Sequence, residues 1–225
     1  MLNRFDLGLH SADVQQFSPD PDYAAKQRRL MRALGQARRR PGRVEAIFLD
    51  EMGYSRWPEP GPDYGGPTPV ADRRGANNGL WRLIGGLNAR TGRLDYLDAY
   101  IVGRAKVIQF YRQLVAAYPR AERLYVIQDN WSIHTHPDVL AALGRWPQVR
   151  PVWLPTYAPW LNPIEKVWRW LRQDVLKLHR QADNWAALQE RVHGFLGQFA
   201  SGSERLLEYV GLYGQGRLAR MIHGP

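Results

Sequence analysis

The order of strand-like and helix-like segments constrains the fold of this chain more than any other feature of its sequence. Short, β-prone apolar runs predict five strands, at residues 44–49, 80–87, 93–102, 123–128 and 149–154. Apolar positions at helical spacing predict five helices, at residues 21–40, 106–118, 137–143, 163–180 and 185–199. Three successive strands followed by alternating strands and helices predict an α/β fold with a mixed sheet. An antiparallel meander would continue into parallel strands, flanked by helices.

We expect one large domain with two small appendages. Residues 1–43 carry nine Lys or Arg against four Asp, and they form a predicted basic arm or linker with one helix. That helix would be capped by Asp20, with Pro21 in its first turn. Residues 44–210 form the predicted main domain, and residues 211–225 a C-terminal tail. A loop rich in Pro and Gly at 58–79 has no predicted role.

Composition narrows the chemistry that a site can use. The chain has no cysteine, which excludes disulfides and thiolate metal sites. Hydrophobic residues make up 44%, too many for a disordered chain. No apolar run approaches the roughly 18 residues of a membrane span, and the N-terminus lacks the apolar core of a signal peptide. We therefore expect a cytoplasmic protein without a membrane partner.

The charge balance favours a polyanionic partner. Lys and Arg number 31 against 21 Asp and Glu, which gives a net charge of +10 and a pI near 10.1. A basic surface attracts phosphate backbones and releases counterions when it binds them. Arginine used only for solubility would give the same balance, so charge alone leaves nucleic acid and plain solubility as alternatives.

Three acidic residues stand where α/β sheets build their sites. Asp50 and Asp129 follow apolar strands, and Glu165 opens a helix after the last strand. Three carboxylates without Cys suit Mg²⁺ or Mn²⁺, and two such ions about 4 Å apart can promote an in-line attack on a phosphodiester. Each acid also has a structural interpretation. The two aspartates are typical turn residues, and Glu165 completes a capping box with Asn162.

Three sequence blocks resemble the DDE catalytic core of mariner-like insertion-sequence transposases. They are FLDE at 48–51, VIQDNWSIH at 126–134 and LPTYAPWLNPIEKVW at 154–168. The proline-bracketed third block is the most specific, and the resemblance covers about residues 44–210. The step of 36 residues from Asp129 to Glu165 is also similar to the spacing in that superfamily.

The resemblance implies a ribonuclease H-like fold with Asp50, Asp129 and Glu165 as catalytic and metal-binding residues. It implies two Mg²⁺ or Mn²⁺ ions, with Asp50 shared between them and the other two acids each completing one site. The implied reaction on double-stranded DNA is hydrolysis at the element ends, followed by attack of the freed 3′-OH on target DNA. A homodimer and association with the nucleoid are further implications.

Full-length members of that family carry helix-turn-helix domains before the catalytic core. The basic arm at residues 1–43 is too short for them, so we expect end recognition to come from a separate subunit or to be missing. Two alternatives stay open. One is a ribonuclease H-like endonuclease without strand transfer, and the other is a catalytically inactive or domesticated DNA-binding or interaction module.

Five further residues are predicted to support the site or contact DNA. Asn130 would orient Asp129 or touch DNA, and His134 would contact a phosphate or a carboxylate, although a structural role is its main alternative. Asn162 is predicted to cap the helix that carries Glu165. Lys166 and Arg169 lie on the basic face of that helix, which would follow a phosphate backbone or simply face solvent.

Neighbouring acidic and aromatic residues need separate assignments. Glu51 would point to the face of the strand opposite Asp50, so only one of the two would face the site. Most tryptophans are assigned to the core, including Trp131 and Trp168. Trp160 and Trp170 lie off the apolar stripe, where core packing competes with stacking on unpaired bases.

Overall fold

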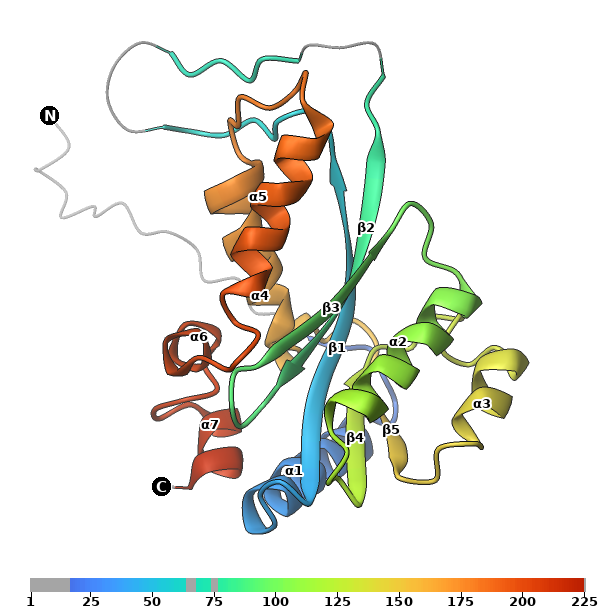
Figure 1. Cartoon of the computed structure of the whole chain (residues 1–225). Helices are drawn as coiled ribbons and strands as arrows, with labels where there is room; N and C mark the ends of the chain where they lie inside the picture. The colour runs from blue at the N-terminus through green and yellow to red at the C-terminus, as the bar shows by residue number, and fades with distance from the viewer. Residues whose placement is uncertain (1–16, 64–67, 74–76, 225) are drawn as a thin grey trace, which may run out of the picture.

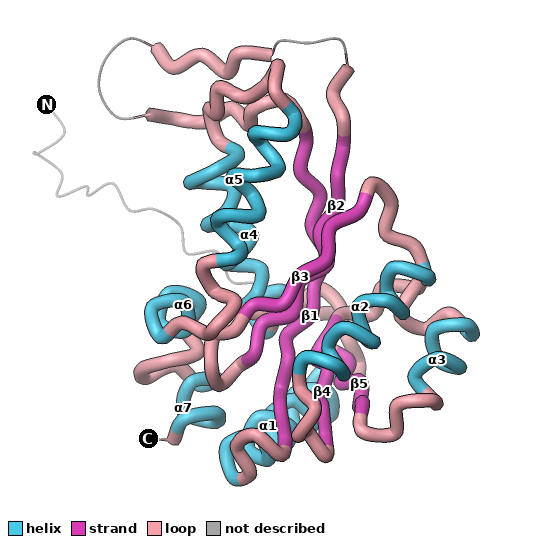
Figure 2. The backbone as a smooth tube through the Cα atoms, viewed as in Figure 1, coloured by secondary structure: helices cyan, strands magenta, loops and turns pink. Residues whose placement is uncertain are grey.

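The computed structural model describes residues 17–63, 68–73 and 77–224 and contains one five-stranded mixed sheet (Figures 1 and 2). The strand order is β3-β2-β1-β4-β5. β1, β2 and β3 pair antiparallel, whereas β4 lies parallel to both β1 and β5. The strands span β1 (Val44–Ser55), β2 (Leu80–Asn88), β3 (Leu94–Ala99), β4 (Arg123–Gln128) and β5 (Val149–Trp153). The predicted meander followed by parallel strands is confirmed.

Helices cover both faces of this sheet. One face packs against α2 (Arg104–Ala117) and α3 (Pro137–Leu143), around a core that includes Phe110 and Tyr111. The opposite face carries the larger core. Its helices are α1 (Tyr23–Arg39), α4 (Ile164–Leu171), α5 (Trp185–Gly197), α6 (Glu204–Val210) and α7 (Arg217–His223). In Figure 1, α4 and α5 stand on one side of the strands, and α2 and α3 stand on the other.

The first strand is longer than predicted. We expected it to end before Asp50, but β1 continues to Ser55. Its parallel pairing with β4 does stop early, at Phe48 opposite Ile127, whereas its antiparallel pairing with β2 runs on to Ser55. Asp50 therefore lies inside a strand, two residues past the end of the parallel ladder.

Two helix boundaries also differ from the predictions. The first helix begins at Tyr23 after Asp22, so Asp20 does not cap it. The buried carboxylate of Asp20 instead pairs with Lys26 and accepts the backbone N–H of Thr156. The helix predicted to reach residue 180 ends as α4 at Leu171. One π-helical turn follows at Arg172–Leu176.

The first and last described helices, α1 and α7, pack onto the main body. The core beneath α4 includes Leu30 and Leu34 of α1 and Ile222 of α7. The boundaries at 43 and 210 stay predictions, but the described parts of both predicted appendages contribute to the same core. Residues 1–16 of the predicted arm, 64–67 and 74–76 of the predicted loop, and residue 225 lie outside the described residues. Within the described ranges, no helix combines the length and apolarity needed to cross a membrane.

Candidate active site

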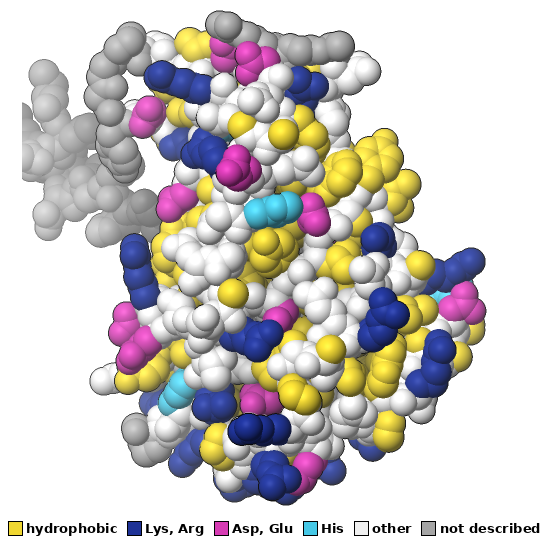
Figure 3. All heavy atoms as spheres, in the orientation of Figure 1, with side chains coloured by type: hydrophobic (Ala, Val, Ile, Leu, Met, Phe, Trp, Pro, Cys, Tyr) yellow, Lys and Arg dark blue, Asp and Glu magenta, His cyan; other side chains and the backbone are white. Residues whose placement is uncertain are grey.

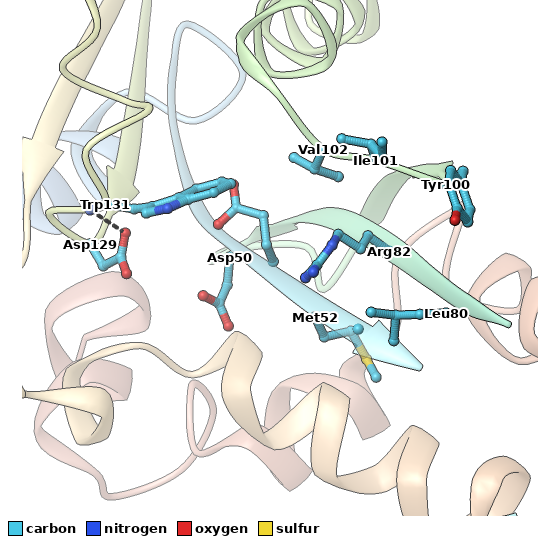
Figure 4. A pocket seen from close by; sticks show the side chains of 11 residues that line it. Asp50, Met52, Leu80, Arg82, Tyr100, Ile101, Val102, Asp129 and Trp131 are labelled. Atoms are coloured by element: carbon cyan, nitrogen blue, oxygen red, sulfur yellow. Dashed lines mark hydrogen bonds between the residues drawn. The ribbon is translucent and has the colours of Figure 1, made fainter. Parts of the chain in front are cut away.

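Asp50, Asp129 and Glu165 line one cavity of about 440 Å³ at the carboxyl end of the parallel strands. They come from three elements: β1, the segment just after β4, and the first turn of α4. The neighbouring cavity of about 650 Å³ shares Asp50 and Asp129 and is shown in Figure 4. Three predicted site residues, 79 and 36 positions apart in sequence, thus face a common space.

Asp50 is the most buried of the three acids, and its environment disfavours a negative charge. Burial raises the pKa of its carboxyl to about 8, and the nearby charges of Glu165 and Glu51 add to the rise. The indole N–H of Trp168 donates to Asp50 Oδ2 at 2.9 Å and opposes this rise. In the absence of a cation, the site therefore holds a proton on Asp50 at neutral pH.

A glycine makes room for this contact. Gly85 of β2 pairs with Asp50 across the antiparallel ladder. A Cβ at position 85 would lie 2.4 Å from Trp168 Cη2 and 3.1 Å from Ile164 Cδ1. The missing side chain therefore lets α4 approach the sheet closely enough for Trp168 to reach Asp50.

Asp129 and Glu165 are more open to solvent than Asp50. Asp129 Oδ1 accepts the backbone N–H of Trp131 at 3.0 Å, which fixes the turn after β4 (Figure 4). The pKa of Glu165 is raised by partial burial and by Asp129, while Arg169 and Arg172 oppose the rise. A cation bound between these acids would reduce their mutual repulsion.

Glu51 faces away from Asp50, as the strand alternation predicts. Its neighbours Ile47 and Leu49 belong to the core on the α2 side, whereas Asp50 contacts α4. His134 is fully buried on the Glu51 side, with Nε2 3.4 Å from Glu51 Oε1 and 3.8 Å from Asp129 Oδ1. His134 thus bridges the space between two carboxylates, and neither of its ring nitrogens has a hydrogen-bond partner in the described structure.

The two predicted asparagines hold the site's backbone together. Asn162 does not cap α4 through its side chain, because the helix begins one residue later than predicted, at Ile164 after Pro163. Its Nδ2 instead donates to the carbonyl of Leu49, next to Asp50, at 3.3 Å. Asn130 Nδ2 donates to the carbonyl of Leu154, at 2.9 Å. The asparagines therefore join α4 to β1 and the turn after β4 to the segment after β5.

The basic and aromatic candidates have different environments. Lys166 and Arg169 are exposed on α4, beside Glu165. Trp160 is 39% exposed, and its indole N–H donates to Tyr23. Trp170 packs among other aromatic rings under the guanidinium of Arg205, and its N–H donates to Asp174. The stacking alternative therefore does not suit Trp170, whose ring already has partners.

Sequence reasoning assigned Trp168 only to the core and did not single out Gly85. A signal was present for each. Trp168 stands three residues after Glu165, on a neighbouring helix position, and Gly85-Gly86 interrupts an apolar strand. Neither signal identified Asp50 as the partner of Trp168, because these two residues are 118 positions apart in the sequence.

The donor chemistry of the cavity fits hard divalent cations, which prefer carboxylate oxygens. Burial and the neighbouring acids disfavour the negative charge of Asp50, and a bound positive ion would stabilise that charge. As arranged, however, no three His, Asp or Glu side chains among the described residues are close enough to hold a metal ion.

Residues 45–189 match the family model described as DDE superfamily endonuclease. The chain belongs to this family. The matched range contains Asp50, Asp129 and Glu165, and the predicted relationship to DDE transposase catalytic domains is confirmed.

One curated protein is similar to part of this chain. A Shigella sonnei protein named "Insertion element IS630 uncharacterized 39 kDa protein" is 28% identical over 116 residues, covering 52% of this chain and 34% of that protein. This DDE family member thus spans about a third of its curated relative.

Solved structures show the same fold. The mariner Mos1 paired-end complex with Mg matches 98% of this chain and 67% of that chain, at a TM-score of 0.62 and 16% identity. The complex with Mn matches 94% and 64%, at a TM-score of 0.60 and 16% identity. At such identities the likeness establishes the fold, and the predicted ribonuclease H-like architecture is confirmed.

Proposed function

We propose that this chain is the catalytic domain of a DNA transposase. It would hydrolyse phosphodiesters at element ends and join the freed 3′-OH to target DNA. The observation that carries the proposal is the cavity shared by Asp50, Asp129 and Glu165. The relative named for an insertion element and the fold of the transposon-end complexes support the same activity and a double-stranded DNA substrate.

Asp50, Asp129 and Glu165 are the residues that we propose to hold two Mg²⁺ or Mn²⁺ ions. When bound, such ions activate the attacking oxygen and stabilise the leaving oxygen of a phosphodiester. Asp50 would be the acid shared by both, as the resemblance implies.

The chain's own contacts prepare these acids for their task. Trp168 fixes Oδ2 of Asp50, and the Asp50 side chain lines the cavity. Asn162 holds the start of the Glu165 helix against the strand that carries Asp50. These contacts preorganise ligands that would otherwise repel one another, which is the usual role of groups around a metal site.

The remaining predicted residues are proposed to act around the reaction. Lys166 and Arg169 would contact the phosphate backbone near Glu165, and Asn130 and His134 would position the turn that carries Asp129. A homodimer, a separate end-binding subunit and nucleoid association rest on the resemblance alone and stay predictions. The same holds for residues 44–210 as the extent of the catalytic domain.

The test is a nicking and joining assay on supercoiled plasmid with Mg²⁺ or Mn²⁺. Wild type is compared with Asp129→Asn, which removes a charge from an exposed side chain with little change in shape. Metal-dependent nicking that is lost in the variant supports the proposal, and joined products establish strand transfer.

Two other results would replace the proposed activity. Nicking without joined products would indicate an endonuclease without strand transfer. DNA binding with no metal-dependent cleavage, even after a helix-turn-helix end-binding subunit is supplied, would indicate an interaction module.

A further inference from the structure

A basic groove runs from the carboxylate cavity along the first helix. The cavity that holds Glu165 shares Pro159 and Asn162 with a second cavity of about 690 Å³, between α1, α4 and α7. This second cavity shares Gln27 and Met31 with a third, of about 450 Å³, between α1 and α7. The three hollows therefore adjoin one another and mark out a path from the carboxylates to α1.

The walls of this path are strongly positive. Its second and third cavities are lined by six basic side chains: Arg28, Arg32, Arg39, Lys166, Arg169 and Arg217. All six are exposed, and none forms an ion pair with a described residue. Among the described residues, Glu165 is the only acidic one that lines these two cavities, at the end next to the candidate active site. We call the surface that these six side chains line the α1–α7 basic groove.

The positions on α1 place its arginines along one line. Arg28, Arg32 and Arg39 follow a spacing of four and seven residues, which keeps them on one face of a helix. Gly35 lies between them with no side chain to close the groove, and Met221 of α7 lies across from it. From Arg28 to Arg39 the helix rises about 17 Å, the length of roughly five phosphates along one DNA strand.

This arrangement does not serve the stability of the helix. α1 contains six Lys or Arg and no Asp or Glu. Like charges at Arg28 and Arg32 repel one another across one helical turn, whereas Arg38 and Arg39 in the last turn suit the helix dipole. A bound polyanion would offset the repulsion between Arg28 and Arg32. Figure 3 shows basic side chains gathered at the end of the molecule that holds α1.

We infer that the α1–α7 basic groove binds the phosphate backbone of the DNA duplex whose scissile bond lies in the carboxylate cavity. This inference rests on the proposed function, which places a phosphodiester beside Glu165. It adds a specific surface, formed by residues outside the three sequence blocks except Lys166 and Arg169. The groove would hold the duplex through contacts that read no sequence.

The test measures the binding of a fluorescein-labelled DNA duplex in EDTA over a range of salt concentrations. The groove variant is R28A/R32A/R217A. Its matched control is R112A/R120A/R145A, which removes the same charge from exposed positions on or next to α2 and α3. The slope of log K against log salt is negative, and each lost phosphate contact makes it shallower by about one. We expect the slope of the groove variant to become shallower by about 3, and that of the control by less than about 1.

Equal loss in both variants, or unchanged binding by the groove variant, would overturn the inference. If the triple variant does not fold, Arg32→Glu is compared with Arg112→Glu in the same assay. Because binding is measured without metal, a failed proposed function shows as absent cleavage, whereas a failed groove shows as an unaltered salt slope.

Discussion

The indole ring of Trp168 occupies the space that a side chain at Gly85 would fill. A Cβ built at Gly85 would lie 2.4 Å from Trp168 Cη2, far closer than two non-bonded carbon atoms can approach. The same indole donates its N–H to Asp50, the residue that pairs with Gly85 on the neighbouring strand. One glycine on β2 thereby sets the orientation of a candidate catalytic carboxylate on β1.

Gly85→Ala should destabilise the protein and impair the site together. Overpacking at such a contact costs about 1–3 kcal/mol, and relief requires Trp168 to move away from Asp50. We expect a lower midpoint of urea unfolding and at least a tenfold loss in nicking rate. Gly53→Ala is the control, since a Cβ there meets no atom closer than 3.5 Å. A variant with normal nicking would show that the Trp168 contact is dispensable.

Trp168→Phe should separate the hydrogen bond from the packing. Phenylalanine keeps most of the ring but cannot donate to Asp50, so the pKa of Asp50 should rise further. Loss of such a supporting contact weakens metal binding or activity by about 10–100-fold. Mn²⁺ titration followed by nicking rates would measure it. Trp170→Phe, which loses a bond to Asp174 instead, should leave Mn²⁺ affinity unchanged.

The raised pKa of Asp50 predicts how metal-free stability depends on pH. The folded protein keeps this proton up to about pH 8, whereas the unfolded chain releases it near the ordinary value of 3.8. The Asp50 contribution to the free energy of unfolding should therefore be fully present below about pH 4 and decline as pH rises towards about 8. Asp50→Asn should flatten this decline. The measurement is thermal unfolding in EDTA across this pH range, for the wild type and for Asp50→Asn. If the stability of both proteins depends on pH in the same way, the buried-charge interpretation is refuted.

Added Mg²⁺ should stabilise the wild type more at pH 8.5 than at about pH 6. Binding at the carboxylates competes with the proton on Asp50, so affinity rises as that proton is lost. The measurement is the shift in Tm on addition of Mg²⁺ at both pH values. The shift on addition of Ca²⁺ is measured in the same way for comparison. Asp50→Asn should lose the pH dependence of the shift. An equal shift in that variant would place the binding elsewhere.

Asn162→Ala should damage activity more than stability. It removes the bond to the carbonyl of Leu49, worth about 1 kcal/mol, and frees the start of α4 from the strand that carries Asp50. Asn184→Ala is matched in cost, because Asn184 caps α5 by accepting the N–H of Ala187. Urea unfolding should show similar losses, while nicking should fall only for Asn162→Ala. Similar nicking in both variants would leave Asn162 a purely structural role.

Much of the fold could be predicted from the sequence. The strands at 80–87 and 123–128 and the helix at 137–143 match β2, β4 and α3 to within one residue. Their signals are local, because burial of one face imposes a period of about two in strands and 3.6 in helices. The three motif blocks likewise singled out Asp50, Asp129 and Glu165, which line one cavity.

The sequence alone did not decide which groups meet across elements. The continuation of β1 past Asp50 depends on β2 pairing beyond the end of β4, and no local signal in β1 marks it. Asn162 has the sequence of a helix cap, yet it binds the carbonyl of Leu49.

By itself, the sequence determined the five strands, the first five helices and their order, and it singled out the three acids, whereas α6 and α7 were not predicted. Local propensity and periodic burial act over a few residues, and so they can be read from neighbours in the chain. Only the tertiary structure decided that Trp168 would donate to Asp50, that Gly85 would make room for it, and that α1 and α7 would enclose a basic groove. These relationships depend on packing between distant segments, where the fit of side chains in three dimensions selects the partner.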